Sequence, residues 1–250
     1  MPSPIATVEV PASSANLGSA FDCAGLALGL YDEVIVRVAD SGLSVDVAGE
    51  GADELPRNKR HLVVSTLRQA FAALGGQPRG LEVVCANRIP QSRGLGSSSA
   101  AIVAAIVAAR ALVLGGEEAL DDQAALALAT EIEGHPDNVA ACLYGGLTLA
   151  WHSGDALQVS RLAVHPDIAP VAFIPSSRAS TKKARGLLPA TIDFPDAAAN
   201  SARAALLPLA MTTSPALLFD ATEDRIHQQF RASAMPRTAA LVESLRADGI

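Results

Sequence analysis

Residues that suit phosphate binding are concentrated in one stretch, Pro90–Ala101, which reads Pro-Gln-Ser-Arg-Gly-Leu-Gly-Ser-Ser-Ser-Ala-Ala. Gly94 and Gly96 permit left-handed backbone torsions and a close approach to a ligand. An apolar helical run follows, and the first N–H groups of a helix lack intrahelical partners and carry partial positive charge. Phosphate is therefore the ligand that this stretch favours, and a serine hydroxyl there can also ligate a metal ion.

Three acidic residues, a histidine and an asparagine lie within a second stretch, Glu131–Asn138. Mg²⁺ prefers one or two carboxylates together with substrate phosphates and water. The stretch therefore indicates a metal and substrate site. A polar helix end capped by Asn or Asp stays open as the alternative.

Two well-known phosphate-binding patterns are excluded for the first stretch. A P-loop ends in Gly-Lys-Ser/Thr, and this loop holds no lysine. The dinucleotide fingerprint requires a third glycine where Ser99 stands. On the residues alone, a glycine turn followed by a serine N-cap remains the alternative to a phosphate site.

The elements that must position these residues follow from periodicity. The strand-like run Leu81–Ala86 leads into the first stretch, and Ala100–Leu114, apolar nearly all round, predicts a central buried helix after it. A helix capped by Asp121 or Asp122 should carry the second stretch at its end near Glu133. Alternation and helical spacing predict further elements at Ile5–Val10, Val34–Val38, Leu43–Val47, His61–Leu74 and Ile168–Ile174, with a hairpin turn at Asp40–Gly42.

Composition narrows the class of protein. With 250 residues, half of them hydrophobic, the chain is long enough for a sizeable core. A net charge of −7 argues against a general nucleic-acid binder. Three widely spaced cysteines form neither a metal pattern nor a disulfide framework, which favours a reducing cytoplasm. The most apolar segment is too short to span a bilayer, so we expect no membrane partner.

The complete string Pro90–Ala101 resembles the phosphate-binding motif of the GHMP kinases, Pro-x-x-x-Gly-Leu-Gly-Ser-Ser-Ala-Ala, with Ser99 where the family usually has alanine. The segment Pro11–Leu28, with its Asn-Leu-Gly and Phe-Asp-x-x-Gly-Leu-Ala-Leu, narrows the resemblance to the homoserine kinase family. Ser180–Pro189 and Glu223–Arg231 also resemble segments of that family, with Gln229 in place of a usual proline.

The resemblance implies phosphorylation of L-homoserine by ATP, with Mg²⁺, in threonine biosynthesis. It implies that Ser98 and Glu131 hold Mg²⁺, an assignment that prefers Glu131 to Glu133. The catalytic group would be Ser98, Glu131 and Asn138, and the residues that position homoserine would be Asn16, Asp22, His135, Asn138, Arg185 and Arg231. The nucleotide would be held by Pro90, Gln91, Ser92, Arg93, Gly94, Leu95, Gly96, Ser97, Ser98, Ser99 and Ala100. No residue suggests itself as general base, so we expect direct in-line transfer.

The resemblance also implies an α+β, two-lobed GHMP kinase fold. An N-terminal ribosomal-protein-S5-like lobe would bind ATP over residues 1–153, and a C-terminal ferredoxin-like lobe would occupy residues 154–250. Family members usually continue past the position of Ile250 into a glycine-rich third motif and closing strands, so we expect the second lobe to lack its final strands. A GHMP-type kinase for another small alcohol, and a catalytically impaired nucleotide-binding protein, stay open as alternatives. The expected partners are ATP and L-homoserine, with no nucleic acid and no membrane, and a homodimer stays open.

Overall fold

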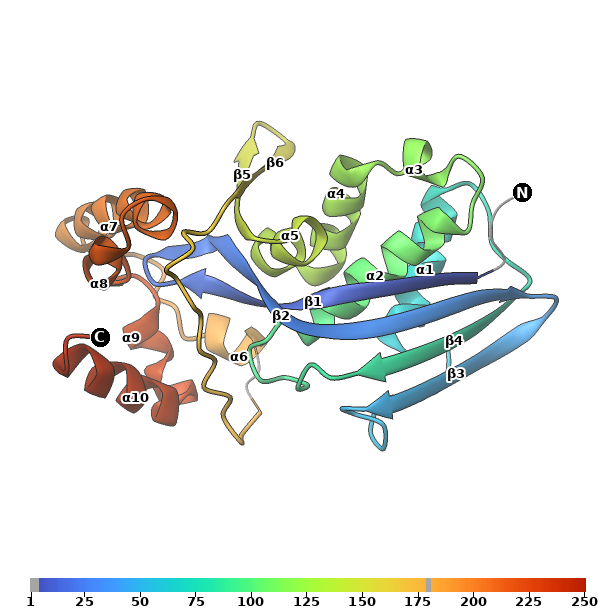
Figure 1. The fold of residues 1–250 in the computed structure, drawn as a ribbon, viewed down its shortest axis with the longest axis horizontal. Helices are drawn as coiled ribbons and strands as arrows, with labels where there is room; N and C mark the ends of the chain where they lie inside the picture. The colour runs from blue at the N-terminus through green and yellow to red at the C-terminus, as the bar shows by residue number, and fades with distance from the viewer. Residues whose placement is uncertain (1–4, 179–180) are drawn as a thin grey trace.

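The computed structural model describes residues 5–178 and 181–250 of the chain. Its centre is a twisted sheet with the strand order β3-β4-β2-β5-β6, and β1 pairs with β2 as well (Figure 1). Strand β2 is antiparallel to β1, β4 and β5, whereas β3 and β4 are parallel. The strands are β1 Ile5–Leu17, β2 Ala20–Ala39, β3 Gly42–Gly49, β4 Gly80–Asn87, β5 Leu147–Ser153 and β6 Ala156–Leu162.

Two local expectations about the strands are corrected. The turn at Asp40–Gly42 does not form a hairpin, because β4 lies between β2 and β3 in the sheet. Strand β1 does not end at Val10 but continues to Leu17, with irregular register after Pro11 and Ala15. The small residues after Val10 therefore extend the β1–β2 pair toward the C-terminal helices.

Helices cover one side of this sheet (Figure 1). They are α1 Leu62–Ala73, α2 Ser97–Ala111, the short α3 Gly116–Ala119, α4 Asp122–Glu133 and α5 Pro136–Tyr144. Helix α2 packs against α1, α4, α5 and β1, and most of its residues are buried. The prediction of a central buried helix is confirmed. Its start lies at Ser97, three residues before the expected Ala100, so the three serines form its first turn.

The second half of the chain is mainly helical in the residues that the structure describes. Its helices are α6 Thr181–Arg185, α7 Phe194–Thr212, α8 Leu218–Ala221, α9 Gln228–Arg231 and α10 Pro236–Ala247, with 3₁₀ turns at Pro215–Leu217 and Ala232–Ala234. Ser180, in the motif around Arg185, lies outside the described residues. No strand forms at 168–174, where β-structure was expected; Val171 and Phe173 there stay exposed. No described helix is both long and apolar enough to cross a membrane.

The C-terminal helices gather at the end of the molecule where β1 turns into β2 (Figure 1). Ser19 Oγ in this turn donates to the carbonyl of Ala221, at 2.9 Å, and the Asn200 side chain of α7 donates to the Ser19 carbonyl, also at 2.9 Å. A side chain at Gly18 would place its Cβ 2.5 Å from Thr222, so only glycine permits this contact. The boundary predicted near Ser153–Gly154 falls in the turn between the paired strands β5 and β6, and the division into lobes stays a prediction.

Candidate active site

The loop between β4 and α2 is anchored at both ends by the β1–β2 pair. At its start, the buried carboxylate of Asp32 accepts hydrogen bonds from the backbone N–H groups of Arg88, at 2.6 Å, and Ile89, at 2.8 Å. Near its end, the carbonyl of Leu95 accepts a bond of 3.1 Å from the backbone of Ser13. Burial raises the pKa of Asp32, although these backbone bonds oppose the rise.

The two glycines of the loop are required for different reasons. Both have left-handed torsions, with φ of 79° at Gly94 and 69° at Gly96. A Cβ on Gly94 would meet nothing within 4 Å, whereas a Cβ on Gly96 would lie 2.1 Å from Ser13 Oγ and 3.2 Å from Asn138 Oδ1. Gly94 therefore leaves open space beside the loop, and Gly96 permits tight packing at the start of α2.

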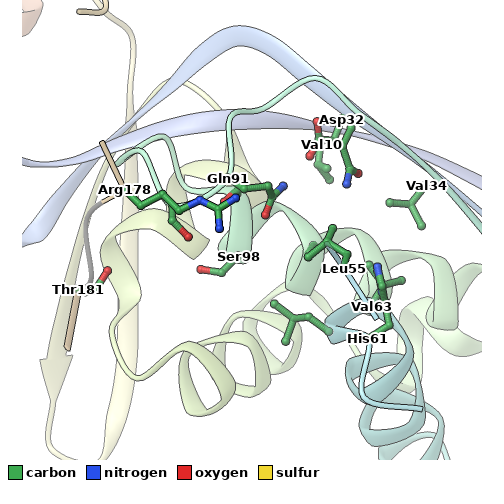
Figure 2. Close-up of a pocket in the computed structure, with 15 residues that line it drawn as sticks. Val10, Asp32, Val34, Leu55, His61, Val63, Gln91, Ser98, Arg178 and Thr181 are labelled. Carbon is green, nitrogen blue, oxygen red and sulfur yellow. The ribbon is translucent and has the colours of Figure 1, made fainter. Parts of the chain in front are cut away.

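A cavity of about 480 Å³ adjoins this loop (Figure 2). Gln91, Ser92, Ser97 and Ser98 line it on the loop side, and Arg178 and Thr181 reach it from the second half of the chain. Its other wall is formed by residues of β1, β2, the end of β4, the start of α2, and α1 with the segment before it. Most of these residues are apolar, and Asp32, Asn87 and His61 are the polar ones. The full set is Val10, Asp32, Val34, Leu55, His61, Leu62, Val63, Asn87 and Ala101. An apolar wall opposite a few polar groups is typical of small-molecule sites.

The remaining loop residues expected to hold the nucleotide do not line this cavity. Leu95, Ser99 and Ala100 are buried in the packing of the loop and of α2. The guanidinium of Arg93 donates a hydrogen bond to the carbonyl of Pro175, which ties the loop to the segment before α6. The stretch thus contributes Gln91, Ser92, Ser97 and Ser98 to the cavity.

Glu133, at the end of α4, faces the serines of α2. One of its carboxylate oxygens, Oε1, accepts hydrogen bonds from Ser98 Oγ at 2.6 Å and from Ser99 Oγ at 2.9 Å. Glu131, the expected partner of Ser98, is exposed instead. Two residues of a helix turn through about 200°, so the two side chains leave α4 on opposite faces. The structure therefore places Glu133, and not Glu131, next to Ser98.

Three polar side chains follow Glu133 in the chain: His135 in the short connection between α4 and α5, and Asp137 and Asn138 in the first turn of α5. His135 Nδ1 lies 2.6 Å from Asp137 Oδ1, and this hydrogen bond is the main reason that the pKa of His135 is raised. Asp137 is fully buried, and its second oxygen, Oδ2, has no hydrogen-bond partner among the described residues. Asn138 Oδ1 accepts a bond of 2.9 Å from Ser13 Oγ, next to Gly96.

Two predicted substrate residues, Asp22 and Arg185, form a forked ion pair across the two halves of the chain. The guanidinium nitrogens lie 2.7 and 2.5 Å from the two carboxylate oxygens. This pairing raises the pKa of Arg185. Asn16 supports the arrangement because its side-chain oxygen accepts a bond of 3.1 Å from the Asp22 backbone, and both residues have φ of 59°.

Arg231 lies beside this pair and shares an aromatic neighbour with it. The Cζ atoms of Arg185 and Arg231 lie 5.4 and 5.9 Å from the centre of the Phe21 ring. Arg231 forms no ion pair within the described part of the chain, and its buried Nε has no hydrogen-bond partner there. Burial and, second, the neighbouring Arg185 lower the pKa of Arg231. The substrate arginines therefore differ: one is already paired and the other has unused hydrogen-bonding capacity.

The structure thus brings part of the predicted set together. Ser98 lines the cavity, and Asp22 pairs with Arg185, which lies over the Phe21 ring with Arg231; Asn16 supports Asp22. Sequence reasoning missed the roles of Ser13, Phe21, Glu133 and Asp137 in this arrangement. A signal for Glu133 was present, because it lies four residues after Ala129 and seven after Leu126, on the buried face of α4.

Comparisons with known proteins agree with this arrangement. The family model for the GHMP kinases N terminal domain matches residues 61–146. The homoserine kinase of Streptomyces avermitilis is 64% identical over 243 residues, covering 97% of this chain and 80% of that protein. The homoserine kinase of Mycobacterium tuberculosis is 49% identical over 247 residues, covering 97% and 78%.

Solved structures show the same relation. The crystal structure of homoserine kinase from Cytophaga hutchinsonii superposes with a TM-score of 0.77 at 28% identity, covering 94% of this chain and 76% of that one. The phosphomevalonate kinase of Streptococcus pneumoniae, at 11% identity and a TM-score of 0.62, shares the fold. The sequence identity over nearly the whole chain, together with the fold, places this chain in the homoserine kinase family of the GHMP kinases.

Proposed function

We propose that the chain transfers the γ-phosphoryl group of ATP to the hydroxyl of L-homoserine, giving ADP and O-phospho-L-homoserine, a step of threonine biosynthesis. The observation that carries the proposal is the position of the Ser98–Glu133 pair. It lies at the start of α2, where Ser98 lines the cavity and Glu133 lies within 4.0 Å of His135, the residue that precedes α5. The homoserine kinase of Streptomyces avermitilis, at 64% identity over 243 aligned residues, supports the same activity.

The cavity is the place proposed for the nucleotide. Its apolar wall suits the adenine ring of ATP, and the first turn of α2 offers backbone N–H groups and serine hydroxyls to the phosphates. The open space beside Gly94 lets a phosphate approach the backbone there. The overall negative charge of the chain makes these local donors the decisive attraction for ATP.

Ser98 and Glu133 would hold Mg²⁺. A hydroxyl and a carboxylate oxygen 2.6 Å apart fit the oxygen ligands that this ion prefers, and the carboxylate is only 12% exposed. Glu133 takes the place first given to Glu131. When bound, Mg²⁺ neutralises charge on the transferring phosphate.

The group around Phe21 would hold the amino-acid end of homoserine. Arg231, with its unused donors, would bind the carboxylate together with Arg185, since guanidinium groups pair with carboxylates through two bonds. Asp22 would meet the ammonium group, and the unpartnered oxygen of Asp137 makes it a second candidate for that contact. These contacts would fix the far end of the substrate so that its hydroxyl points toward the phosphate loop, which is the segment 88–96 between β4 and α2.

His135 and Asn138 would guide the reacting end. Asn138 cannot accept a proton, so its proposed role is to orient the hydroxyl beside Gly96 rather than to activate it. Phosphoryl transfer depends mainly on alignment and on stabilisation of charge, which these residues can supply without a general base.

A coupled assay of ADP release tests the proposal. The purified chain is given MgATP and, separately, L-homoserine, D-homoserine, L-serine and mevalonate, and the phosphorylated product is identified by mass. We expect turnover with L-homoserine far above the other alcohols. Turnover with a different alcohol would show that L-homoserine is not the substrate and that the chain phosphorylates that alcohol instead. ATP binding without turnover on any of the alcohols would favour a nucleotide-binding protein.

A further inference from the structure

His227 is a buried imidazole that the proposed reaction does not use. Its side chain is 3% exposed, in the connection that precedes α9. Asp224 fixes this connection, because its carboxylate accepts bonds from the backbone N–H groups of Ile226, His227 and Gln228 at 3.3, 3.0 and 2.7 Å. The imidazole is therefore held on a well-supported backbone.

The two ring nitrogens of His227 face partners of opposite kinds. Nε2 lies 2.8 Å from the carbonyl oxygen of Gly18, and Nδ1 lies 3.4 Å from Nη1 of Arg231. A carbonyl can only accept and a guanidinium can only donate. Both contacts are satisfied by one form of the ring, the neutral tautomer with its proton on Nε2.

The face of the same ring stacks on Phe21, with ring centres 4.8 Å apart and an angle of 28° between the planes. The guanidinium groups of Arg185 and Arg231 also lie within 6 Å of the Phe21 ring centre. Phe21 on β2 thus lies against Arg185 of α6 and against both His227 and Arg231 of the α9 region, so three separate segments of the chain meet at this ring.

We propose that His227 and Phe21 form a positioning platform that holds the guanidinium of Arg231 beside Arg185 for the substrate carboxylate. This inference rests on the proposed function, in which Arg231 binds that carboxylate. His227 touches no substrate in this account; its neutral ring accepts a hydrogen bond from Arg231 and so sets the direction of the remaining guanidinium donors.

Protonation of His227 would remove the acceptor and place a second positive charge beside Arg231. The charged groups that face the ring are Asp224 in its own connection, Arg231 on α9 and Asp22 on β2. Burial is the largest influence on the pKa of His227 and lowers it, and the charge of Arg231 lowers this pKa further. The hydrogen bond to the Gly18 carbonyl and the carboxylates of Asp224 and Asp22 act in the opposite direction. The platform should therefore be intact at neutral pH and fail only below pH 6.5.

Two amide substitutions separate the roles of the two nitrogens. In His227→Asn the side-chain amide lies near the position of Nδ1 and can still accept from Arg231. In His227→Gln the amide lies near the position of Nε2, so it keeps the contact to Gly18 and loses the acceptor. We expect His227→Gln to raise the KM for homoserine about three- to tenfold, the scale of one hydrogen bond, with the kcat and the KM for ATP nearly unchanged. His227→Asn should raise it less, and His152→Gln, at an exposed position of β5, serves as the control.

Arg231→Leu and the double variant Arg231→Leu/His227→Gln decide whether His227 acts through Arg231. If it does, His227→Gln adds nothing to the homoserine KM once Arg231 is absent. An unchanged KM in Arg231→Leu alone would overturn the proposed substrate role of Arg231. Two other outcomes would overturn the platform and leave the proposed function standing, provided that Arg231→Leu alone raises the homoserine KM. In one, His227→Gln does not change the homoserine KM of the unmodified chain. In the other, His227→Gln raises the homoserine KM by the same factor with and without Arg231. If His227→Gln does not fold, Phe21→Leu takes its place in the comparison with Arg231→Leu and the double variant.

The pH dependence of the reaction supplies an independent readout. The kcat/KM for homoserine should fall below pH 6.5 in the unmodified chain, and this acid limb should be absent in His227→Asn. An acid limb below pH 6.5 that persists in His227→Asn would overturn the inference.

Discussion

Alanine at Gly96 should be much more damaging than alanine at Gly94, two residues earlier in the same loop. Both positions have left-handed torsions, which cost an alanine about 1–2 kcal/mol. At Gly94 the new Cβ meets nothing within 4 Å, so this strain is the whole expected loss. At Gly96 the Cβ would lie 2.1 Å from Ser13 Oγ, which forces Ser13 away from Asn138 and breaks their 2.9 Å hydrogen bond, worth about 0.5–1.5 kcal/mol. With the displacement added, we expect a loss of about 2–4 kcal/mol for Gly96→Ala.

Urea unfolding of the two variants and the unmodified chain measures these free energies, and ATP titration measures the effect on the site. Gly96→Ala should also weaken ATP binding, because the start of α2 with Ser98 must shift. The affinity of Gly94→Ala for ATP should stay closer to that of the unmodified chain. Equal losses of stability in the two variants would refute the packing argument. Normal ATP affinity in folded Gly96→Ala would remove this loop from the nucleotide site.

Three further predictions concern the site itself. Glu133→Gln should raise the Mg²⁺ requirement and lower the kcat, while Glu131→Gln should do neither. The reverse pattern in a Mg²⁺ titration would assign the metal to Glu131, as the family resemblance implies. Arg231→Leu should lose roughly 2–4 kcal/mol in kcat/KM for homoserine and Arg231→Lys should recover part of it, which steady-state kinetics at saturating ATP would measure. Because Asp137 raises the pKa of His135, the protonated histidine stabilises the fold below pH 6.5, and this contribution is lost as the pH rises through the raised pKa. His135→Asn should therefore destabilise the chain more at pH 5.5 than at pH 8.5 in urea unfolding, and a loss that grows with pH would contradict the assignment.

The sequence was sufficient for features that depend on local pattern. The apolar run after the serines predicts the buried helix α2, and the Asp121 side chain caps α4 as its residue type indicates, accepting a bond of 2.8 Å from Ala124. The family motif, read over twelve residues, identified the GHMP kinases because few other loops combine its glycines and serines.

Features that depend on distant contacts could not be predicted in this way. The alternation in β2 and β3 says nothing about β4, which enters between them 30 residues later in the chain. The Asp22–Arg185 pair joins residues that are 163 positions apart. Glu131 and Glu133 are equivalent in composition, and only the face of α4 on which each lies decides which one meets Ser98.

The docking of the β1–β2 turn against α7 and α8 has a consequence for how the enzyme matures on the ribosome. The phosphate loop, α2 and Glu133 all belong to the first 133 residues, and their packing partners emerge early. The turn that carries Asn16 and Asp22 acquires its contacts to Asn200 and Ala221 only after those residues have been synthesised. Arg231 arrives later still. We therefore expect a nascent chain to gain affinity for nucleotide before it gains affinity for the amino acid, so that the acceptor pocket is assembled last, on a phosphate site that is already folded.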